Sequence, residues 1–191
     1  AITLGCKTTG SHLDRDIPVA PDKDPMDAGA TIRIGMIGVG CMGGGHMNGL
    51  LDQAKRGDDK HEVVALCDVA QPRLDDRLAQ ARAKAPDTEI TGYTRHEDLL
   101  ARDDIDCVLI ASTEHWHAQH AVDAIAAGKD LALASKEILV MAGKFVMAAA
   151  REKGITLRPV DSEHNAVAQC LADNPTKDVA RVVLTASGGA F

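Results

Sequence analysis

Short apolar runs rich in β-branched residues alternate with segments of helical periodicity from residue 31 onward. The runs that predict strands are Thr31–Ile37, Glu62–Cys67, Asp106–Ala111, Asp130–Ala134, Ile155–Val160 and Ala180–Thr185. Between two of them, Leu74, Leu78 and Ala81 recur on one side of a helix over 71–85, which Pro86 ends. Strands that are apolar along their length and alternate with helices predict an α/β fold, a Rossmann-like doubly wound and mostly parallel sheet covered on both faces.

The beginning and end of the chain differ from this regular middle part. Residues 1–30 contain three prolines and many charged residues without periodicity, which indicates a polar, disordered or extended arm. The length of 191 residues allows one well-buried domain with an extension. We therefore expect an arm over 1–30, a dinucleotide-binding domain over 31–158, and the start of a catalytic, metal-binding domain over 159–191.

Composition narrows the choice of partners and compartment. The net charge of −7, without a cluster of Lys and Arg, argues against nucleic acid as a partner. No apolar run approaches the ~20 residues of a membrane span, so we expect no membrane partner and a cytoplasmic location. The five cysteines form no CxxC pair, and three of them lie in or beside apolar strand-like runs, which favours reduced core thiols over disulfides or a zinc site.

A glycine pattern, Gly38-x-Gly40-x-x-Gly43, follows the first strand and opens a helical segment. In this context Gly38 permits a tight turn, Gly40 lets backbone amides approach a pyrophosphate, and Gly43 lets the helix lie close to the strand. The pattern predicts a dinucleotide site that also includes Cys41 and Met42. A glycine-rich turn without a ligand is the alternative.

An aspartate, Asp68, closes the second strand. An acid at this position accepts the ribose hydroxyls of NAD and repels the 2′-phosphate of NADP, so charge alone favours NAD. Arg73, five residues later, is placed to meet a 2′-phosphate, and the choice between NADH and NADPH stays open. The alternative role for Asp68 is that of a turn residue before Pro72.

Two carboxylates, Asp161 and Glu163, stand one residue apart after the Ile155–Val160 run. Hard divalent cations such as Mg²⁺ and Mn²⁺ are bound by oxygen ligands of this kind. The same residues are also typical of a helix start, with Ser162 as the N-cap residue and acids in the first turn.

Residues ~31–120 resemble the nucleotide-binding half of the Gfo/Idh/MocA sugar oxidoreductases. The resemblance rests on Thr31–Gly40, on the VVALCDV run, and on Thr113-Glu-His-Trp-His117. It implies that Thr113 and His115 line the nicotinamide region. A metal site of Glu114, His117 and His120 on one helical face is an alternative, although histidines on a helix surface are more often solvated.

Residues ~121–191 resemble 1-deoxy-D-xylulose-5-phosphate reductoisomerases, which use NADPH and a divalent metal in isoprenoid precursor synthesis. The resemblance rests on AGKDLALASKEILVMAGKFVMAAAREKG, PVDSEHNAVAQCL and VVLTASGGAF. It implies Mg²⁺ or Mn²⁺ on Asp161 and Glu163, and Ser135 and Glu137 near the nicotinamide. It also implies a catalytic, substrate-binding Lys136, with Ser162 and Ser187 as further substrate ligands. Serine replaces the family's asparagine at 135, which removes one hydrogen-bonding group.

These patterns together favour an NAD(P)H- and divalent-metal-dependent oxidoreductase of the reductoisomerase type, acting on a small phosphorylated, sugar-like substrate. The third metal ligand and other parts of that family's site lie beyond the equivalent of Phe191, so we expect an incomplete site here and a homodimer in the complete protein. The alternatives are a metal-free sugar or polyol dehydrogenase and a nucleotide-binding module without turnover.

Overall fold

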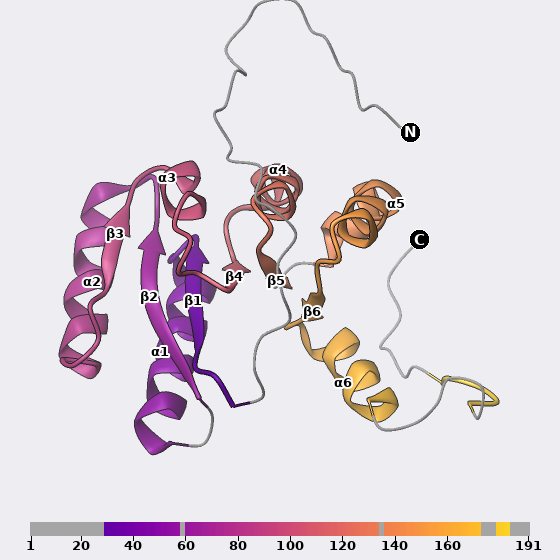
Figure 1. The fold of residues 1–191 in the computed structure, drawn as a ribbon, viewed down its shortest axis with the longest axis horizontal. Coiled ribbons are helices and arrows are strands. Elements are labelled where there is room, and N and C mark those ends of the chain that lie inside the picture. The colour runs from indigo at the N-terminus through magenta and orange to yellow at the C-terminus, as the bar shows by residue number, and fades with distance from the viewer. Residues whose placement is uncertain (1–28, 58–59, 134–135, 173–178, 184–191) are drawn as a thin grey trace, which may run out of the picture.

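A computed structural model describes residues 29–57, 60–133, 136–172 and 179–183, and shows one sheet with helices around it (Figure 1). The strands are β1 Ile32–Ile37, β2 His61–Cys67, β3 Thr91–Tyr93, β4 Cys107–Ile110, β5 Asp130–Leu133 and β6 Leu157–Pro159. The helices are α1 Cys41–Arg56, α2 Gln71–Lys84, α3 His96–Leu100, α4 Glu114–Ala126, α5 Glu137–Glu152 and α6 Ser162–Leu171.

All strands run parallel, in the order β3-β2-β1-β4-β5-β6. In the central pair, Gly35 lies opposite Val108 and Ile37 opposite Ile110. The order reverses direction between β1 and β4, and ligands of open α/β sheets bind at the carboxyl ends of the strands beside such a reversal. The predicted Rossmann-like sheet is therefore confirmed.

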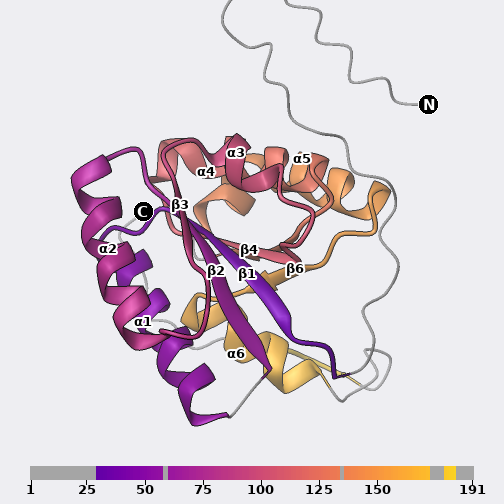
Figure 2. The ribbon, with the colours of Figure 1, turned by 60° about the vertical axis from the view of Figure 1, so that its left-hand side comes forward.

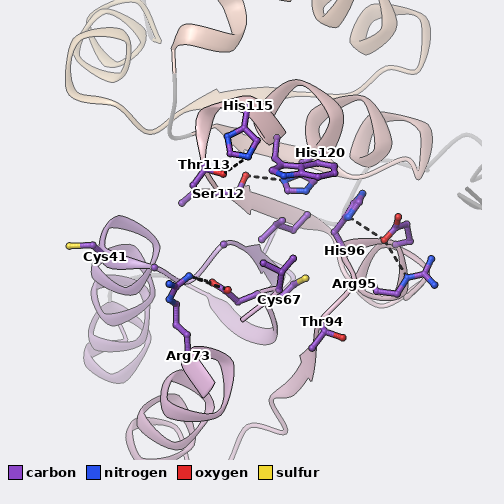
Figure 3. A pocket seen from close by; sticks show the side chains of 18 residues that line it. Cys41, Cys67, Arg73, Thr94, Arg95, His96, Ser112, Thr113, His115 and His120 are labelled. Carbon is purple, nitrogen blue, oxygen red and sulfur yellow. Dashed lines mark hydrogen bonds and ion pairs between the residues drawn. The ribbon is translucent and has the colours of Figure 1, made fainter. Parts of the chain in front are cut away.

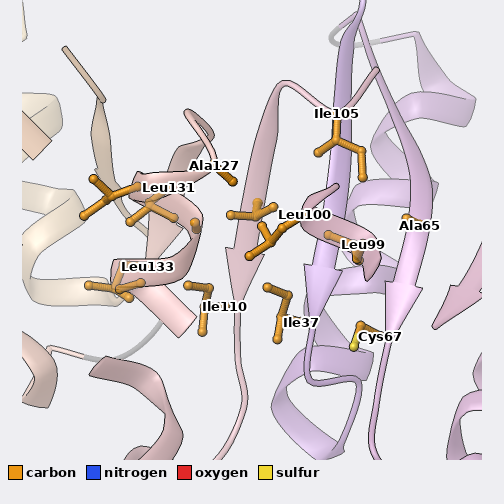
Figure 4. Close-up of a cluster of buried hydrophobic side chains, with 14 of the residues drawn as sticks. Ile37, Ala65, Cys67, Leu99, Leu100, Ile105, Ile110, Ala127, Leu131 and Leu133 are labelled. Carbon is orange, nitrogen blue, oxygen red and sulfur yellow. The ribbon is translucent and has the colours of Figure 1, made fainter. Parts of the chain in front are cut away.

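Helices cover both faces of the sheet, as Figure 2 shows, and each face has its own core. Met36, Leu66 and Leu109 point to the face where α1 and α2 pack. Their neighbours Ile37 and Ile110 point to the opposite face, where α3, α4 and α5 pack (Figure 4). Successive residues of a strand face opposite sides, so a sheet buried on both faces needs strands that are apolar at every position.

Proline and glycine end the helices as expected. Helix α2 stops at Lys84, two residues before Pro86. Gly128 follows α4 with φ 69°, and Gly154 follows α5 with φ 66°. These left-handed conformations close the helices, and each returns the chain to the next strand of the sheet.

Three elements differ from the sequence prediction. The edge strand β3 and the short helix α3 were not predicted, because three residues of strand and five of helix are too short to show a period. A strand over Ala180–Thr185 was predicted wrongly for its described part: Ala180–Val183 has no regular structure. Val182 and Val183 are exposed, and no neighbouring strand pairs with them in the described residues. Leu184, Thr185 and almost all of the predicted arm lie outside the described residues.

Four cysteines lie in the described residues, and all are free thiols. Only Cys67 is buried, whereas Cys41 and Cys170 are exposed, so the expectation of core thiols holds for one position. Burial raises the pKa of the Cys67 thiol to about 12. In the part of the chain that the structure describes, no helix has the length and apolar character to cross a membrane.

Candidate functional site

A cavity of about 800 Å³ opens at the carboxyl ends of β1, β2, β3 and β4 (Figure 3). The residues that line it are Ile37, Gly38, Gly40, Cys41, Cys67, Asp68, Val69, Arg73, Thr94, Arg95, His96, Glu97, Ala111, Ser112, Thr113, His115, Trp116 and His120. Such a position beside the reversal of strand order is where doubly wound sheets bind nucleotides.

The glycine loop forms one side of this cavity. Gly38 has φ 87°, and a Cβ there would lie 2.5 Å from the backbone nitrogen of Ser112 in the neighbouring β4–α4 turn. A Cβ on Gly43 would overlap the carbonyl oxygen of Gly38, whereas a Cβ on Gly40 would meet nothing within 4 Å. The absence of side chains at Gly38 and Gly43 therefore allows the loop, α1 and the neighbouring strand to pack closely. The absence of a side chain at Gly40 leaves open space at the start of α1. This is the backbone cradle that binds pyrophosphate in dinucleotide sites.

Asp68 lies at the base of the cavity, at the end of β2, with 6 % of its surface exposed. Its carboxylate accepts hydrogen bonds from the backbone amides of Val39 (3.1 Å) and Ala70 (2.9 Å). Nη1 of Arg73 lies 3.2 Å from Oδ1 and 3.3 Å from Oδ2. Asp68 thus ties the glycine loop to the β2–α2 turn and also faces the cavity.

A buried histidine forms part of the opposite wall. Nε2 of His96 lies 2.7 Å from Oδ2 of Asp123, and Nδ1 of His96 lies 3.2 Å from Oε2 of Glu97. Oδ1 of Asp123 accepts a hydrogen bond of 2.7 Å from Gln119. These bonds join the turn after β3 to the middle of α4 and fix the His96 ring at the cavity.

Three aromatic rings lie next to one another along the same wall. The rings of His96 and His120 lie 4.4 Å apart, and those of His120 and Trp116 lie 5.7 Å apart and almost parallel, at 15°. Nδ1 of His120 lies 2.9 Å from the hydroxyl oxygen of Ser112. Trp116 and His120 thus form a stacked pair at the cavity, and the His96 ring meets His120 at a tilt of 55°.

Six of the ten predicted cofactor residues line the cavity, namely Gly38, Gly40, Cys41, Asp68, Thr113 and His115. Gly43 is buried beneath the loop, Met42 is 63 % exposed outside the cavity, and Glu137 begins α5. Ser135 lies outside the described residues.

The α4 histidines differ from the solvated surface expected of them. His117 and His120 are buried, and both ring nitrogens of His117 lack a hydrogen-bond partner. Burial lowers the pKa of His117. The backbone of Thr113 and the negative charges of Glu114 and Glu137 raise this pKa, but by less than burial lowers it. The alternative metal site of Glu114, His117 and His120 does not form in the described residues.

A second group of polar residues lies where β6 ends and α6 begins. Nζ of Lys136 is 3.1 Å from Oε2 of Glu163 and 3.5 Å from Oδ2 of Asp161. Nδ1 of His164 also contacts that Asp161 oxygen, at 3.0 Å, and the Ser162 hydroxyl donates to Glu163 at 3.1 Å. The structure thus brings together four of the predicted site residues: Lys136, Asp161, Ser162 and Glu163.

Electrostatics favour the charged forms of Lys136 and Glu163. The hydrogen bond to Glu163, aided by Asp161, raises the pKa of Lys136. A hydrogen bond from its own backbone amide, then those from Lys136 and Ser162, lower the pKa of Glu163. The N-cap residue of α6 is Asp161 rather than Ser162, and no side chain caps the helix. The segment 161–163 therefore forms the start of α6 and also carries the two carboxylates that pair with Lys136.

A groove of about 330 Å³ begins at this polar group and continues between β6, α5 and α6. Leu139, Met147, Leu157 and Val167 line its apolar part. Asp161, Glu163 and His164 line its polar end together with Lys136. Ser187, the remaining predicted substrate ligand, lies outside the described residues.

Sequence reasoning missed the β3 side of the cavity. Thr94, Arg95, His96 and Glu97 line that side because β3 occupies the sheet edge next to β2. The Thr91–Tyr93 run has three residues, which is too short for its sequence pattern to predict a strand. No sequence pattern therefore indicated that the four residues after it lie at the carboxyl edge of the sheet.

Comparison with known proteins identifies the nucleotide-binding part. Residues 32–158, about two thirds of the chain, match the model of the oxidoreductase family with an NAD-binding Rossmann fold. The chain belongs to this oxidoreductase family. Residues 157–191 match a second model, the 1-deoxy-D-xylulose 5-phosphate reductoisomerase C-terminal domain. A nicotinamide cofactor follows from the first match together with the glycine loop.

Curated relatives of this chain carry the reductoisomerase name. The 1-deoxy-D-xylulose 5-phosphate reductoisomerase of Thermoanaerobacter pseudethanolicus is 50 % identical over 131 residues, which cover 68 % of this chain and 33 % of the relative. That of Heliobacterium modesticaldum is 39 % identical over 145 residues, or 71 % and 37 % of the two chains. The chain therefore spans about a third of the length of these relatives, and the similarity extends well beyond residues 121–191.

Solved structures share the fold. The WlbA dehydrogenase of Chromobacterium violaceum, crystallised with NADH and UDP-GlcNAcA, superposes with a TM-score of 0.62 at 20 % identity, covering 78 % of this chain and 41 % of that one. At this identity the likeness shows the Rossmann fold alone.

Proposed function

We propose that the protein is an NAD(P)H- and divalent-metal-dependent reductoisomerase of the 1-deoxy-D-xylulose 5-phosphate type. The observation that carries the proposal is the convergence of Asp161 and Glu163 on the ammonium of Lys136 at the carboxyl edge of the sheet. The chain spans about a third of its reductoisomerase relatives, so the activity belongs to the complete protein.

The strand order supports contact between the polar group and a bound dinucleotide. The glycine loop follows β1, Lys136 follows β5 and Asp161 follows β6, and β6 lies three positions from β1. At about 4.8 Å per strand the two ends are roughly 14 Å apart. A dinucleotide that leaves its pyrophosphate at Gly40 extends over β4 toward β5, which brings its nicotinamide near Lys136.

The carboxylates fit a divalent cation. Asp161 Oδ2 and Glu163 Oε2 both lie within 3.5 Å of one point, which the Lys136 ammonium occupies in this structure. Oxygen donors of this kind suit Mg²⁺ or Mn²⁺, whose remaining positions are filled by substrate oxygens, waters and further carboxylates. An ion held by Asp161 and Glu163 would polarise the carbonyl of a chelated hydroxyketone and so assist rearrangement of its carbon skeleton to an aldehyde, and NAD(P)H would supply the hydride that reduces this aldehyde.

The side chains around the carboxylates have distinct tasks in this proposal. Lys136 moves from the carboxylates to an anionic oxygen of the phosphorylated, sugar-like substrate. The Ser162 hydroxyl, which is exposed and donates to Glu163, turns to the substrate as a further ligand. His164 keeps Asp161 oriented through its 3.0 Å contact.

Manganese binding by the full-length protein tests the metal site. Electron paramagnetic resonance should show that Asp161→Asn and Glu163→Gln each weaken Mn²⁺ binding at least tenfold. The matched control is Asp52→Asn, which removes an exposed carboxylate of α1 that pairs with Lys84 of α2. Equal Mn²⁺ binding by all the variants would overturn the metal site.

A metal-free sugar or polyol dehydrogenase is the second candidate, because the family model of the Rossmann domain covers most of the described chain. The two candidates differ in turnover with 1-deoxy-D-xylulose 5-phosphate and NADPH. Reduction that stops when the metal is chelated supports the reductoisomerase. Oxidation of a sugar or polyol that is unchanged by chelation supports the dehydrogenase, and cofactor binding without either reaction indicates a nucleotide-binding module.

A further inference from the structure

The residue between the first two glycines of the loop is fixed from both sides. Val39 is fully buried, and its backbone N–H donates to Oδ2 of Asp68 at 3.1 Å. Its carbonyl oxygen accepts a hydrogen bond of 3.1 Å from Nε of Arg77, which comes from the middle of α2. Two side chains from outside the loop therefore hold its central peptide groups in place.

The bond from Arg77 sets the direction of a loop amide. The Val39 carbonyl and the Gly40 N–H belong to one planar, trans peptide group, in which the two point in opposite directions. Gly40 lines the cavity, whereas Arg77 is not among the residues that line it. Because Arg77 holds the carbonyl on its own side, the Gly40 N–H is turned away from α2. An amide at this position is one of those that approach a pyrophosphate.

The missing side chain of Gly44 makes room for this arginine. A Cβ on Gly44 would lie 2.8 Å from Cζ and 2.9 Å from Nε of Arg77. The Gly44 N–H donates to the Gly40 carbonyl at 2.8 Å and so closes the first turn of α1. The guanidinium therefore lies against the first turn of α1, next to the positive end of the helix dipole.

The charge of Arg77 is not cancelled by an acid. Its guanidinium donates to two neutral acceptors, the Val39 carbonyl and the side-chain oxygen of Gln80 at 2.9 Å. Arg73 and Arg95, by contrast, each pair with a carboxylate. In the part of the chain that the structure describes, no carboxylate forms an ion pair with Arg77. The half-buried guanidinium thus adds a positive charge to the field at the N-terminus of α1, which favours an anion there.

We propose that Arg77 is a positioning residue for the pyrophosphate of the cofactor. It aims the Gly40 amide through the Val39 carbonyl, and its charge attracts the phosphates to the N-terminus of α1. Arg77 acts through the loop and does not touch the cofactor. The inference rests on the nicotinamide-dependent function proposed above and specifies how the phosphate site of that function is held.

Ligands with and without a pyrophosphate test this role. Trp116, the single tryptophan of this chain, lines the cavity, so quenching of its fluorescence measures binding of NADH and NADPH to the full-length protein. Competition with NADH measures binding of ADP and adenosine. Arg77→Met should weaken NADH, NADPH and ADP by the same factor, about tenfold, and change adenosine binding by less than about twofold. Arg77→Lys keeps the charge and a donor and should restore part of the lost affinity.

Gly44 provides a second route to the same test. Gly44→Ala keeps Arg77 but displaces its guanidinium, so it should weaken the same three ligands, and adding Arg77→Met should weaken them little further. This variant also decides the case if Arg77→Met does not fold. The matched control is Arg82→Met, which removes another arginine of α2 that donates to a backbone carbonyl, that of Ile90 at 2.8 Å. It should leave the binding of all four ligands unchanged.

Three outcomes would overturn the inference. Arg77→Met binds ADP as tightly as the wild type, it weakens adenosine as much as ADP, or Arg82→Met gives the same loss of ADP affinity. Failure of the nicotinamide-dependent function itself looks different, because then neither cofactor quenches Trp116 in the wild type.

Discussion

The ammonium of Lys136 lies 3.1 Å from Oε2 of Glu163, a residue 27 positions further along the chain. A positive charge beside the carboxylates competes with a divalent cation for the same oxygens. We expect Lys136→Met to raise Mn²⁺ affinity severalfold, as measured by paramagnetic titration. Lys144→Met removes an exposed lysine from the adjoining helix α5 and should leave the affinity unchanged. Weaker Mn²⁺ binding in Lys136→Met would show that the lysine supports the metal.

Substitutions of glycines in the loop and in α1 should affect protein stability and nucleotide binding differently. Gly40→Ala places its Cβ in open space, so the free energy of unfolding should change by less than about 1 kcal/mol while NADH and NADPH binding weakens. Gly43→Ala should lower the free energy of unfolding by about 1–3 kcal/mol through overlap with the Gly38 carbonyl. Gly45→Ala meets nothing within 4 Å inside the helix and should stabilise the protein by up to about 1 kcal/mol. Urea unfolding and Trp116 quenching measure both properties. Unchanged cofactor binding in Gly40→Ala would place the pyrophosphate elsewhere.

Asp123 is a buried anchor of the cavity wall, and it is 2 % exposed. Asp123→Ala leaves His96 and Gln119 without their shared acceptor and should lower the free energy of unfolding by about 3 kcal/mol in urea titrations. Asp123→Asn keeps an acceptor and should cost less. Asp52→Ala, at an exposed ion pair on α1, should leave the stability unchanged. An equal effect of Asp52→Ala would mean that burial does not set the cost.

His117 should make the protein less stable in acid. Burial lowers its pKa in the folded state below the unfolded value of about 6.5, so the unfolded state binds the additional proton as the pH falls. The free energy of unfolding should therefore decrease between pH 7 and pH 5, and this decrease should be smaller in His117→Gln. His164→Gln, at an exposed imidazole, serves as the control. The same decrease in His117→Gln and in the wild type would exclude His117 as its source.

The local sequence pattern was enough to predict the architecture of the sheet and part of the cavity. Apolar strands alternating with helices determine the parallel sheet, because strands buried on both faces need apolar residues at every position. The glycine spacing predicts a pyrophosphate-binding loop after β1. Asp68 directly follows the last apolar residue of the second strand, so its position at the end of β2 is predicted from the sequence. These features depend on residues close together in the sequence.

Strand order and packing decided the rest. The position of β3 at the sheet edge brings His96 to Asp123, and the order β4-β5-β6 brings Lys136 to Asp161 and Glu163. The pairing of Arg73 with Asp68 also comes from the packing of α2, since the sequence places Arg73 nearby without giving its partner. The described residues Ala180–Val183 show the reverse case, because β propensity makes a strand only where a neighbouring strand supplies hydrogen bonds. The sequence by itself therefore determined the kind of sheet and its glycine loop, whereas contacts between residues distant in sequence, which no local period encodes, determined the charge pairs at its carboxyl edge.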